Sequence, residues 1–140
     1  MPLLYQFAAF PSCEKVRWAL DYKAVAYQPV NLILGPHIKT TRKLAKNTSV
    51  PIFVDDEKVV QGAAEIISYL EKTIRHPPLT PANSQDASMA HEWERFLDRN
   101  LAVPLRVYFY HHAFLDRALV TDFLWRDGGV ALTIFLAFEG

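Results

Sequence analysis

Residues 50–62 read Val-Pro-Ile-Phe-Val-Asp-Asp-Glu-Lys-Val-Val-Gln-Gly. Two short runs, Ile52 to Val54 and Lys58 to Gln61, flank a tight polar turn, and this pattern predicts a β-hairpin. Gly62 ends the second run. The residues from Ala63 to Thr73 then place apolar side chains on one face at helical spacing, which indicates an amphipathic helix. This stretch therefore predicts two antiparallel strands followed directly by a helix.

The segments before the hairpin predict a strand, a helix and a second strand. The apolar run Leu3 to Phe7 is consistent with a buried strand. Glu14 to Tyr22 has the helical spacing, with Ser12 in the N-cap position. Tyr27 to Leu32 is the second strand. Strands joined through one helix in this way normally lie parallel, so the chain is expected to open with a right-handed βαβ unit.

A weak helix and a stiff connector complete the first part of the chain. The basic segment His37 to Lys46 predicts the helix, so the order becomes βαβ, α, then ββα. Three prolines lie between residues 77 and 81, and prolines at this density make a semi-rigid spacer. We therefore place a domain boundary there, with domains at residues 1–81 and 82–140.

The second part of the chain has a helical pattern. An apolar stripe at helical spacing is formed by Trp93, Phe96, Leu97, Leu101 and Leu105. Pro104 should kink this helix, because proline lacks a backbone donor and clashes with the preceding turn. Residues 116–125 predict a further helix. The apolar run at residues 130–138 predicts a surface that needs a partner.

Composition excludes several classes of partner. Lys plus Arg and Asp plus Glu number 15 each, which gives a net charge of zero. A nucleic-acid surface would need clustered basic residues, so we expect no nucleic-acid partner. The lone Cys13 rules out an internal disulfide and fits a reducing compartment. The first residues lack the basic and long apolar stretches of a signal peptide, so we expect none. No apolar run approaches the roughly 20 residues of a membrane span. We expect a cytoplasmic protein with no membrane partner.

Three segments resemble the glutathione transferase family, and they occur in the family's order. They are residues 12–20 (Ser-Cys-Glu-Lys-Val-Arg-Trp-Ala-Leu), residues 48–51 (Thr-Ser-Val-Pro) and residues 61–70 (Gln-Gly-Ala-Ala-Glu-Ile-Ile-Ser-Tyr-Leu). The resemblance covers about residues 3–81 well and the rest loosely. It implies an α/β thioredoxin-like N-terminal domain (βαβαββα), followed by an all-α, incomplete C-terminal domain.

The same resemblance implies a glutathione site, with glutathione as co-substrate. Pro51 would follow a cis peptide bond, and the backbone of Val50 would pair with the cysteinyl part of glutathione. Gln61, Gly62 and Ala63 would lie at its γ-glutamyl end, where the family has a serine in place of Ala63. Lys39 would contact its glycine carboxylate.

The group that activates the glutathione sulfur lies in the family just before the first helix. Phe10 aligns with a position where relatives carry serine, and phenylalanine cannot donate a hydrogen bond. Ser12 and Cys13 are therefore the candidate catalytic residues. Cys13 lies near a helix N-terminus, where the dipole can lower the pKa of a thiol. The more common role for such a residue is a small buried thiol.

Three functions fit these features. The first is a glutathione transferase that joins glutathione to an unidentified small electrophile, with no metal. The second is a non-catalytic binding or dimerisation module on the same scaffold. The third is a monothiol glutathione-dependent oxidoreductase using Cys13. The family implies a homodimer. Tyr108, His111 and His112 either line a pocket for the electrophile or, more commonly for such a stripe, pack in the core.

Overall fold

A four-stranded sheet lies at the centre of the computed structural model, which describes residues 1–115. The strand order is β2-β1-β3-β4. β1 (Leu3–Gln6) pairs parallel with β2 (Gln28–Asn31) and antiparallel with β3 (Ile52–Asp55). β3 pairs antiparallel with β4 (Lys58–Gln61). The predicted βαβ unit and hairpin are both confirmed.

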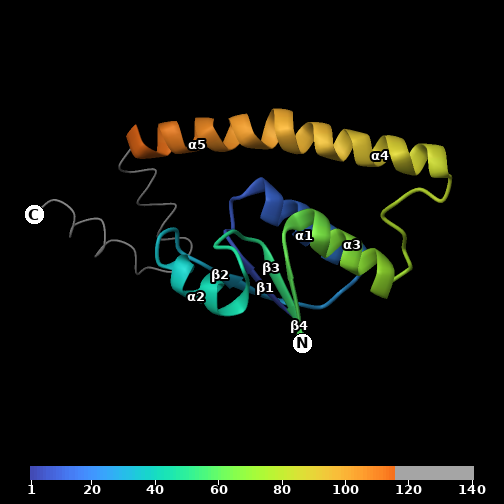
Figure 1. Ribbon diagram of the computed structural model, residues 1–140, viewed down its shortest axis with the longest axis horizontal. Helices are drawn as coiled ribbons and strands as arrows, with labels where there is room; N and C mark the ends of the chain where they lie inside the picture. The colour runs from blue at the N-terminus through green and yellow to red at the C-terminus, as the bar shows by residue number, and fades with distance from the viewer. Residues whose placement is uncertain (116–140) are drawn as a thin grey trace, which may run out of the picture.

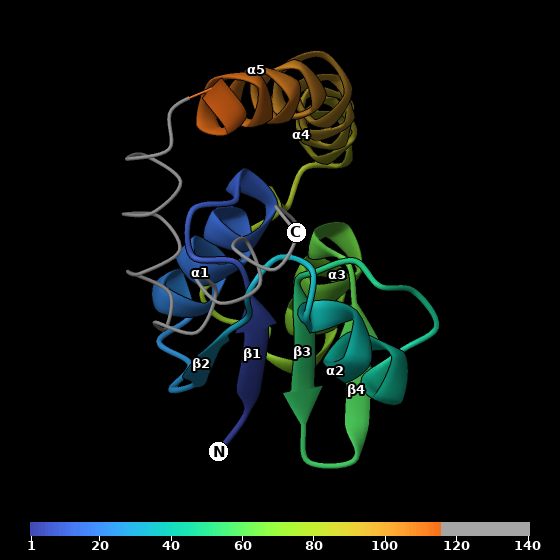
Figure 2. The same ribbon diagram turned by 90° about the vertical axis from the view of Figure 1, so that its left-hand side faces the viewer.

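Helices cover the two faces of this sheet (Figures 1 and 2). α1 (Pro11–Tyr22) and α3 (Ala63–Thr73) lie side by side on one face, and α2 (His37–Leu44) lies on the other. The order of elements is therefore βαβ, α, ββα. This is the thioredoxin-like α/β arrangement expected from the sequence.

The core fills the space between the sheet and the pair α1 and α3. Its fully buried side chains come from two strands and both helices: Leu4, Phe53, Val16, Leu20, Ile66 and Leu70. Burying one such aliphatic or aromatic side chain contributes about 1.5–3 kcal/mol. This packing fixes the starts of α1 and α3 relative to one another.

α1 begins at Pro11, three residues before the Glu14 start that the sequence indicated. Its N-cap is Phe10, which makes no side-chain capping bond, and Pro11 is the first helical residue. Proline suits this position because its φ is already helical and its missing donor has no partner there. The prediction that Ser12 caps the helix is wrong, and Ser12 instead lies in the first turn.

The remaining described residues form one long helical rod that passes over α1 and α3 (Figure 1). It consists of α4 (Ser84–Leu97), the π-helical turn η1 (Asp98–Ala102) and α5 (Val103–Leu115). The side-chain oxygen of Asn83 accepts a hydrogen bond of 2.9 Å from the backbone amide of Gln85, which caps α4.

The kink expected at Pro104 takes the form of a widened turn. Pro104 cannot donate to the carbonyl of Asn100, and its ring presses on that turn. Asn100 lies within η1, where the π-helical turn gives the ring room. The helix therefore continues through Pro104 as α5. The expected helix at residues 116–125 and the apolar run at residues 130–138 lie outside the described residues.

Among residues 1–115, no helix has both the length and the apolar character needed to cross a membrane.

A buried lysine, Lys23, forms hydrogen bonds with the connector that follows α3. The side chain of Lys23 is fully buried, and its Nζ donates to the backbone carbonyls of Ile74 (2.6 Å) and Pro77 (2.9 Å). Nζ also lies 2.6 Å from Oε1 of Glu71. The Glu71 carboxylate in turn accepts hydrogen bonds from the amides of Leu79 and Thr80. This pair ties the end of α1 to α3 and to the chain leading into α4.

Lys23→Met removes the donor to the carbonyls of Ile74 and Pro77 and the partner of the Glu71 carboxylate. Leaving buried acceptors unpaired is destabilising, so we expect Lys23→Met to lower the free energy of unfolding by about 1–3 kcal/mol. Lys72→Met is the matched control, since Lys72 is exposed on α3, and it should change stability by less than about 0.5 kcal/mol. Urea unfolding measures both. Equal losses of unfolding free energy in Lys23→Met and Lys72→Met would contradict the stabilising role of the Lys23–Glu71 pair.

The Lys23–Glu71 ion pair predicts that the stability of the fold depends on pH. Burial alone would raise the pKa of Glu71, but hydrogen bonds from Lys23, Leu79 and Thr80 lower it below its ordinary value. A lowered folded-state pKa contributes stability above the unfolded-state pKa, about 4.3, and this stability is lost as the pH falls through the folded-state value. Glu71→Gln should therefore flatten the acid limb of a plot of unfolding temperature against pH. An unchanged acid limb would contradict this role.

Candidate functional site

The loop before α1 is closed by local contacts around Phe10. The backbone amides of Cys13 and Glu14 donate to the carbonyl of Phe10 at 3.0 and 2.9 Å. The Phe10 ring lies 5.1 Å from the ring of Phe7, centroid to centroid. These contacts hold Phe10, Pro11 and Ser12 at one end of the sheet, facing the helical rod.

The start of α3 is joined to the turn before β3. The amide of Gly62 donates to the carbonyl of Pro51 at 3.0 Å. Gly62 has a φ of 103°, a conformation that favours glycine because it has no Cβ. The Val50–Pro51 peptide bond is cis, as the resemblance implied. These contacts place the first turn of α3 beside the loop that precedes β3.

The side chain of Gln61 forms hydrogen bonds with that same loop. Its side-chain amide donates to the carbonyls of Asn47 (2.9 Å) and Ser49 (2.8 Å), and its side-chain oxygen accepts from the amide of Asn47 at 3.2 Å. The side chain therefore holds the loop before Val50 and Pro51 and lines neither of the two cavities described below. Its expected place at the γ-glutamyl end of glutathione stays a prediction.

A cavity of about 310 Å³ joins the two predicted motifs. Phe10, Pro11 and Ser12 line it from the loop before α1, and Ala63, Ala64 and Glu65 line it from the first turn of α3. Its third wall comes from the rod: Asp98, Ala102, Val103 and Arg106. Hence residues about 50 positions apart in sequence meet at one space, which we call the inner cavity.

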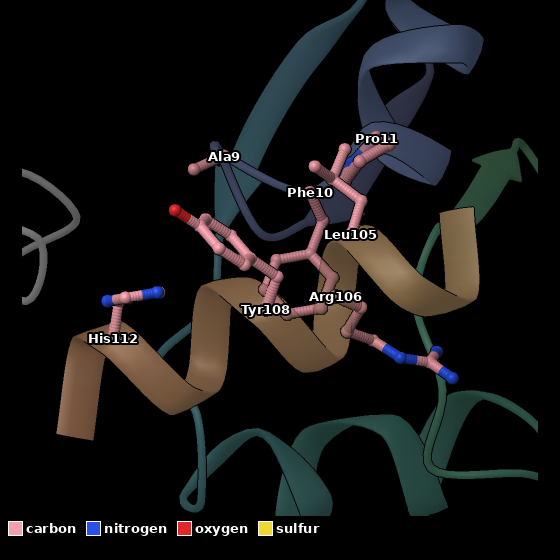
Figure 3. A pocket seen from close by; sticks show the side chains of 7 residues that line it. All are labelled: Ala9, Phe10, Pro11, Leu105, Arg106, Tyr108 and His112. Carbon is pink, nitrogen blue, oxygen red and sulfur yellow. The ribbon is translucent and has the colours of Figure 1, made fainter. Parts of the chain in front are cut away.

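A second cavity of about 420 Å³ adjoins the first, and we call it the outer cavity (Figure 3). Phe10, Pro11 and Arg106 line both. Tyr108 and His112 of α5 line the outer cavity, and their rings lie 4.3 Å apart, centroid to centroid. Aromatic and aliphatic groups dominate its walls. The packing role preferred for Tyr108 and His112 from sequence is therefore wrong for these two residues.

Cys13 lies beneath the inner cavity rather than in it. Its side chain is fully buried, and the residue lines neither cavity. Burial raises the pKa of the Cys13 thiol, which outweighs the opposing effects of hydrogen bonds from Phe7 and Ser12 and of the charge on Arg17. The lowered pKa expected from the helix dipole is therefore wrong. Cys13 matches the small buried thiol that the sequence also allowed.

Lys39 is exposed on α2 and lines neither cavity. Its neighbour His37 packs edge-on against Phe7, with ring centroids 4.9 Å apart, and burial lowers the pKa of His37. α2 thus supports the loop before α1 through His37, while Lys39 remains at the surface. Among residues 1–115, no group of three or more His, Cys, Asp or Glu side chains is arranged to hold a metal ion.

Three charged residues at the inner cavity were not predicted from the sequence. Glu65 is the third residue of α3, Asp98 is the first of η1, and Arg106 comes from α5. Arg106 did carry a signal, because it is the one charged residue between positions 101 and 110.

Comparison with known proteins agrees with this arrangement. Residues 4–78 match the family model for the glutathione S-transferase N-terminal domain. Glutathione S-transferase U1 of Arabidopsis thaliana is 31% identical over 98 residues, which are 68% of this chain and 43% of that protein. The chain spans less than half the length of the first curated relatives it matches.

Solved structures share the fold. FzlA from C. crescentus superposes with a TM-score of 0.72 at 20% identity, covering 98% of this chain and 64% of that one. A glutathione transferase homologue from Burkholderia, with bound glutathione, gives a TM-score of 0.63 at 16% identity, covering 71% of this chain and 57% of that one. With its family match extending over more than half of the sequence, the chain belongs to the glutathione S-transferase family.

Proposed function

We propose that this chain binds glutathione in the inner cavity and transfers its thiolate to an electrophilic small molecule held in the outer cavity. The observation that carries this proposal is the shared lining of the inner cavity. The loop before α1 and the first turn of α3 face the same space of about 310 Å³. The bound glutathione of the Burkholderia homologue supports the choice of ligand.

The tripeptide would lie between backbone groups. The N–H and C=O of Val50 form no hydrogen bond with any residue among positions 1–115, so both are available to an extended peptide, as in strand addition. The first backbone amides of α3, at Ala63 and Ala64, have no partner within the helix. They would donate to a carboxylate of the ligand, which the helix dipole also favours.

Ser12 is our candidate for activating the sulfur. It lines the inner cavity within the first turn of α1, so its hydroxyl can donate to a thiolate while the helix dipole lowers the thiol pKa. The thiol proton leaves to water. The thiolate then forms a carbon–sulfur bond with the electrophile, and a leaving group departs with its electron pair.

The outer cavity suits an apolar electrophile. Its walls include Phe10, Leu105 and Tyr108, and apolar pockets with a few polar groups are the usual form of a small-molecule site. Because Phe10 lines both cavities, it would lie between the sulfur and the electrophile. We also propose, as the sequence led us to expect, that the protein is cytoplasmic and forms a homodimer.

Two substitutions distinguish the proposed catalytic role of Ser12 from that of Cys13. We expect Ser12→Ala to lower kcat/KM for conjugation of 1-chloro-2,4-dinitrobenzene by about 10²-fold, the scale of one lost donor to a developing or stabilised anion. Cys13→Ala should leave kcat/KM within about two-fold of the wild type, because the thiol is buried away from both cavities. The opposite pattern would favour the monothiol oxidoreductase.

A second substitution restores the hydroxyl that the family carries at the start of α3. Ala63→Ser adds a donor to the inner cavity, and a hydrogen bond to a charged group is worth about 1.5–3 kcal/mol. We therefore expect the Kd for reduced glutathione to fall by about ten- to a hundred-fold. Titration calorimetry measures it, with Ala82→Ser in the exposed connector as the control.

The calorimetry also tests the proposal as a whole. No binding of reduced glutathione by either the wild type or Ala63→Ser would contradict the transferase function. It would favour the non-catalytic module that the same scaffold allows. Equal affinities in the wild type, Ala63→Ser and Ala82→Ser would show that residue 63 does not contact the ligand.

A further inference from the structure

A turn built on two alanines joins β1 to the start of α1. The amide of Phe10 donates to the carbonyl of Phe7 at 3.3 Å, so residues 7–10 form a β-turn with Ala8 and Ala9 at its centre. Glycine, proline, asparagine, aspartate and serine are common in turns because their backbone or side chain favours the turn conformation. Alanine offers neither advantage, so support for this turn must come from elsewhere in the fold.

That support comes from Arg17, on the second turn of α1. Its Nη2 donates to the carbonyl of Ala8 at 2.6 Å, and its Nη1 donates to Oε1 of Gln6 at 2.6 Å. Nη2 also forms an ion pair with the carboxylate of Glu14. Hydrogen bonds from a charged donor are stronger than those between neutral groups. One guanidinium therefore holds the end of β1 and the turn against α1.

The Gln6 side of this network is anchored in the sheet. Gln6 is 3% exposed, and its side-chain amide donates to Oδ1 of Asn31, the last residue of β2, at 3.0 Å. Its backbone carbonyl accepts from the amide of Leu32 at 2.8 Å. A buried polar network in which each member has a partner is rigid. The guanidinium thus joins a fixed acceptor in the sheet to the carbonyl of the turn.

The turn that Arg17 holds leads directly into both cavities. Residues 9–11 line the outer cavity, and residues 10–12 line the inner one. Arg17 itself lines neither cavity, and its charge is paired with Glu14. We therefore expect Arg17 to act on a reaction in these cavities through the position of the turn.

We propose that Arg17 is a positioning residue for the conjugation reaction. It holds the turn so that the Ser12 hydroxyl and the Phe10 ring keep their places beside the sulfur. This inference rests on the proposed function and adds the residue that fixes the geometry of its sulfur site. A misplacement of about 1 Å at a reacting group can lower a rate by about a hundred-fold.

The proposed contacts of glutathione itself lie elsewhere. They are the backbone of Val50 and the start of α3, which is held by the hydrogen bond from Gly62 to Pro51. Arg17 touches none of these residues. Loss of Arg17 should therefore lower kcat and leave the affinity for glutathione almost unchanged.

Arg17→Met tests this role, with Arg95→Met as the matched control, because Arg95 is exposed on α4 and lines neither cavity. We expect Arg17→Met to lower kcat for 1-chloro-2,4-dinitrobenzene by about ten- to a hundred-fold. The pKa of the bound glutathione thiol, followed by the ultraviolet absorbance of the thiolate against pH, should rise toward its value in free glutathione. The Kd from titration calorimetry should change by less than about three-fold. Arg95→Met should match the wild type in all three measurements.

Two further variants separate positioning from charge and from stability. Arg17→Lys keeps the charge but not the planar fork that reaches two acceptors, so it should lose nearly as much kcat as Arg17→Met. The double variant Gln6→Leu with Arg17→Met removes both ends of one contact, so the buried oxygen of Gln6 is not left unpaired. Its kcat should stay as low as that of Arg17→Met, because the carbonyl of Ala8 lacks its donor in both.

The inference and the proposed function fail in different ways. Thermal melting of each variant sets an assay temperature at which the fold is retained. If Arg17→Met then keeps the wild-type kcat and thiol pKa, or if the double variant recovers them, Arg17 only stabilises the fold and the inference is overturned. Wild-type kcat in Arg17→Lys also overturns it, because charge alone would then suffice. In these cases the transferase function stands. If the wild type neither binds glutathione nor conjugates the electrophile, both fail together.

Discussion

The hydrogen bond from the amide of Gly62 to the carbonyl of Pro51, 3.0 Å long, couples the two halves of the proposed glutathione site. It holds the start of α3 against the turn that leads into β3. Gln61 adds three hydrogen bonds to residues 47–49 of the same loop. A glycine is favoured at position 62 because its φ is 103°. Chain geometry at this point therefore decides where the inner cavity opens.

Most of the fold was predictable because its signals are local. The alternation and turn at residues 52–61 define a hairpin, and the spacing of Ile66 and Leu70 defines a helix that buries one face. Ser12 was predicted at the N-cap but is the second helical residue, because a preference for serine at the N-cap competes with the preference for proline at the first helical residue. In this structure Pro11 is the first helical residue. The role of Lys23 could not be read either, since lysine is seldom fully buried and its partners lie about 50 residues away.

The candidate site was only half predictable. Phe10, Ser12 and Ala63 followed from motifs and do line the inner cavity, whereas Lys39 and Gln61 followed from the same motifs and do not. Two of the residues that were missed, Asp98 and Arg106, reach the cavity only because the rod passes over the start of α3. That placement depends on packing between distant segments. Lys15, for example, pairs with Glu94 at 2.6 Å and so ties α1 to α4.

Phe10 and Ala63 remove two hydroxyl groups from a site whose family would use both, and this changes which physical forces can hold the ligand. Backbone amides at a helix start act on any anion, so they give little selectivity by themselves. Selectivity must come from side chains with defined charge and geometry. Among the described residues that line this cavity, Ser12 alone carries a hydroxyl group. The proposed activation of the sulfur therefore depends on Ser12 and on the dipole of the helix that carries it.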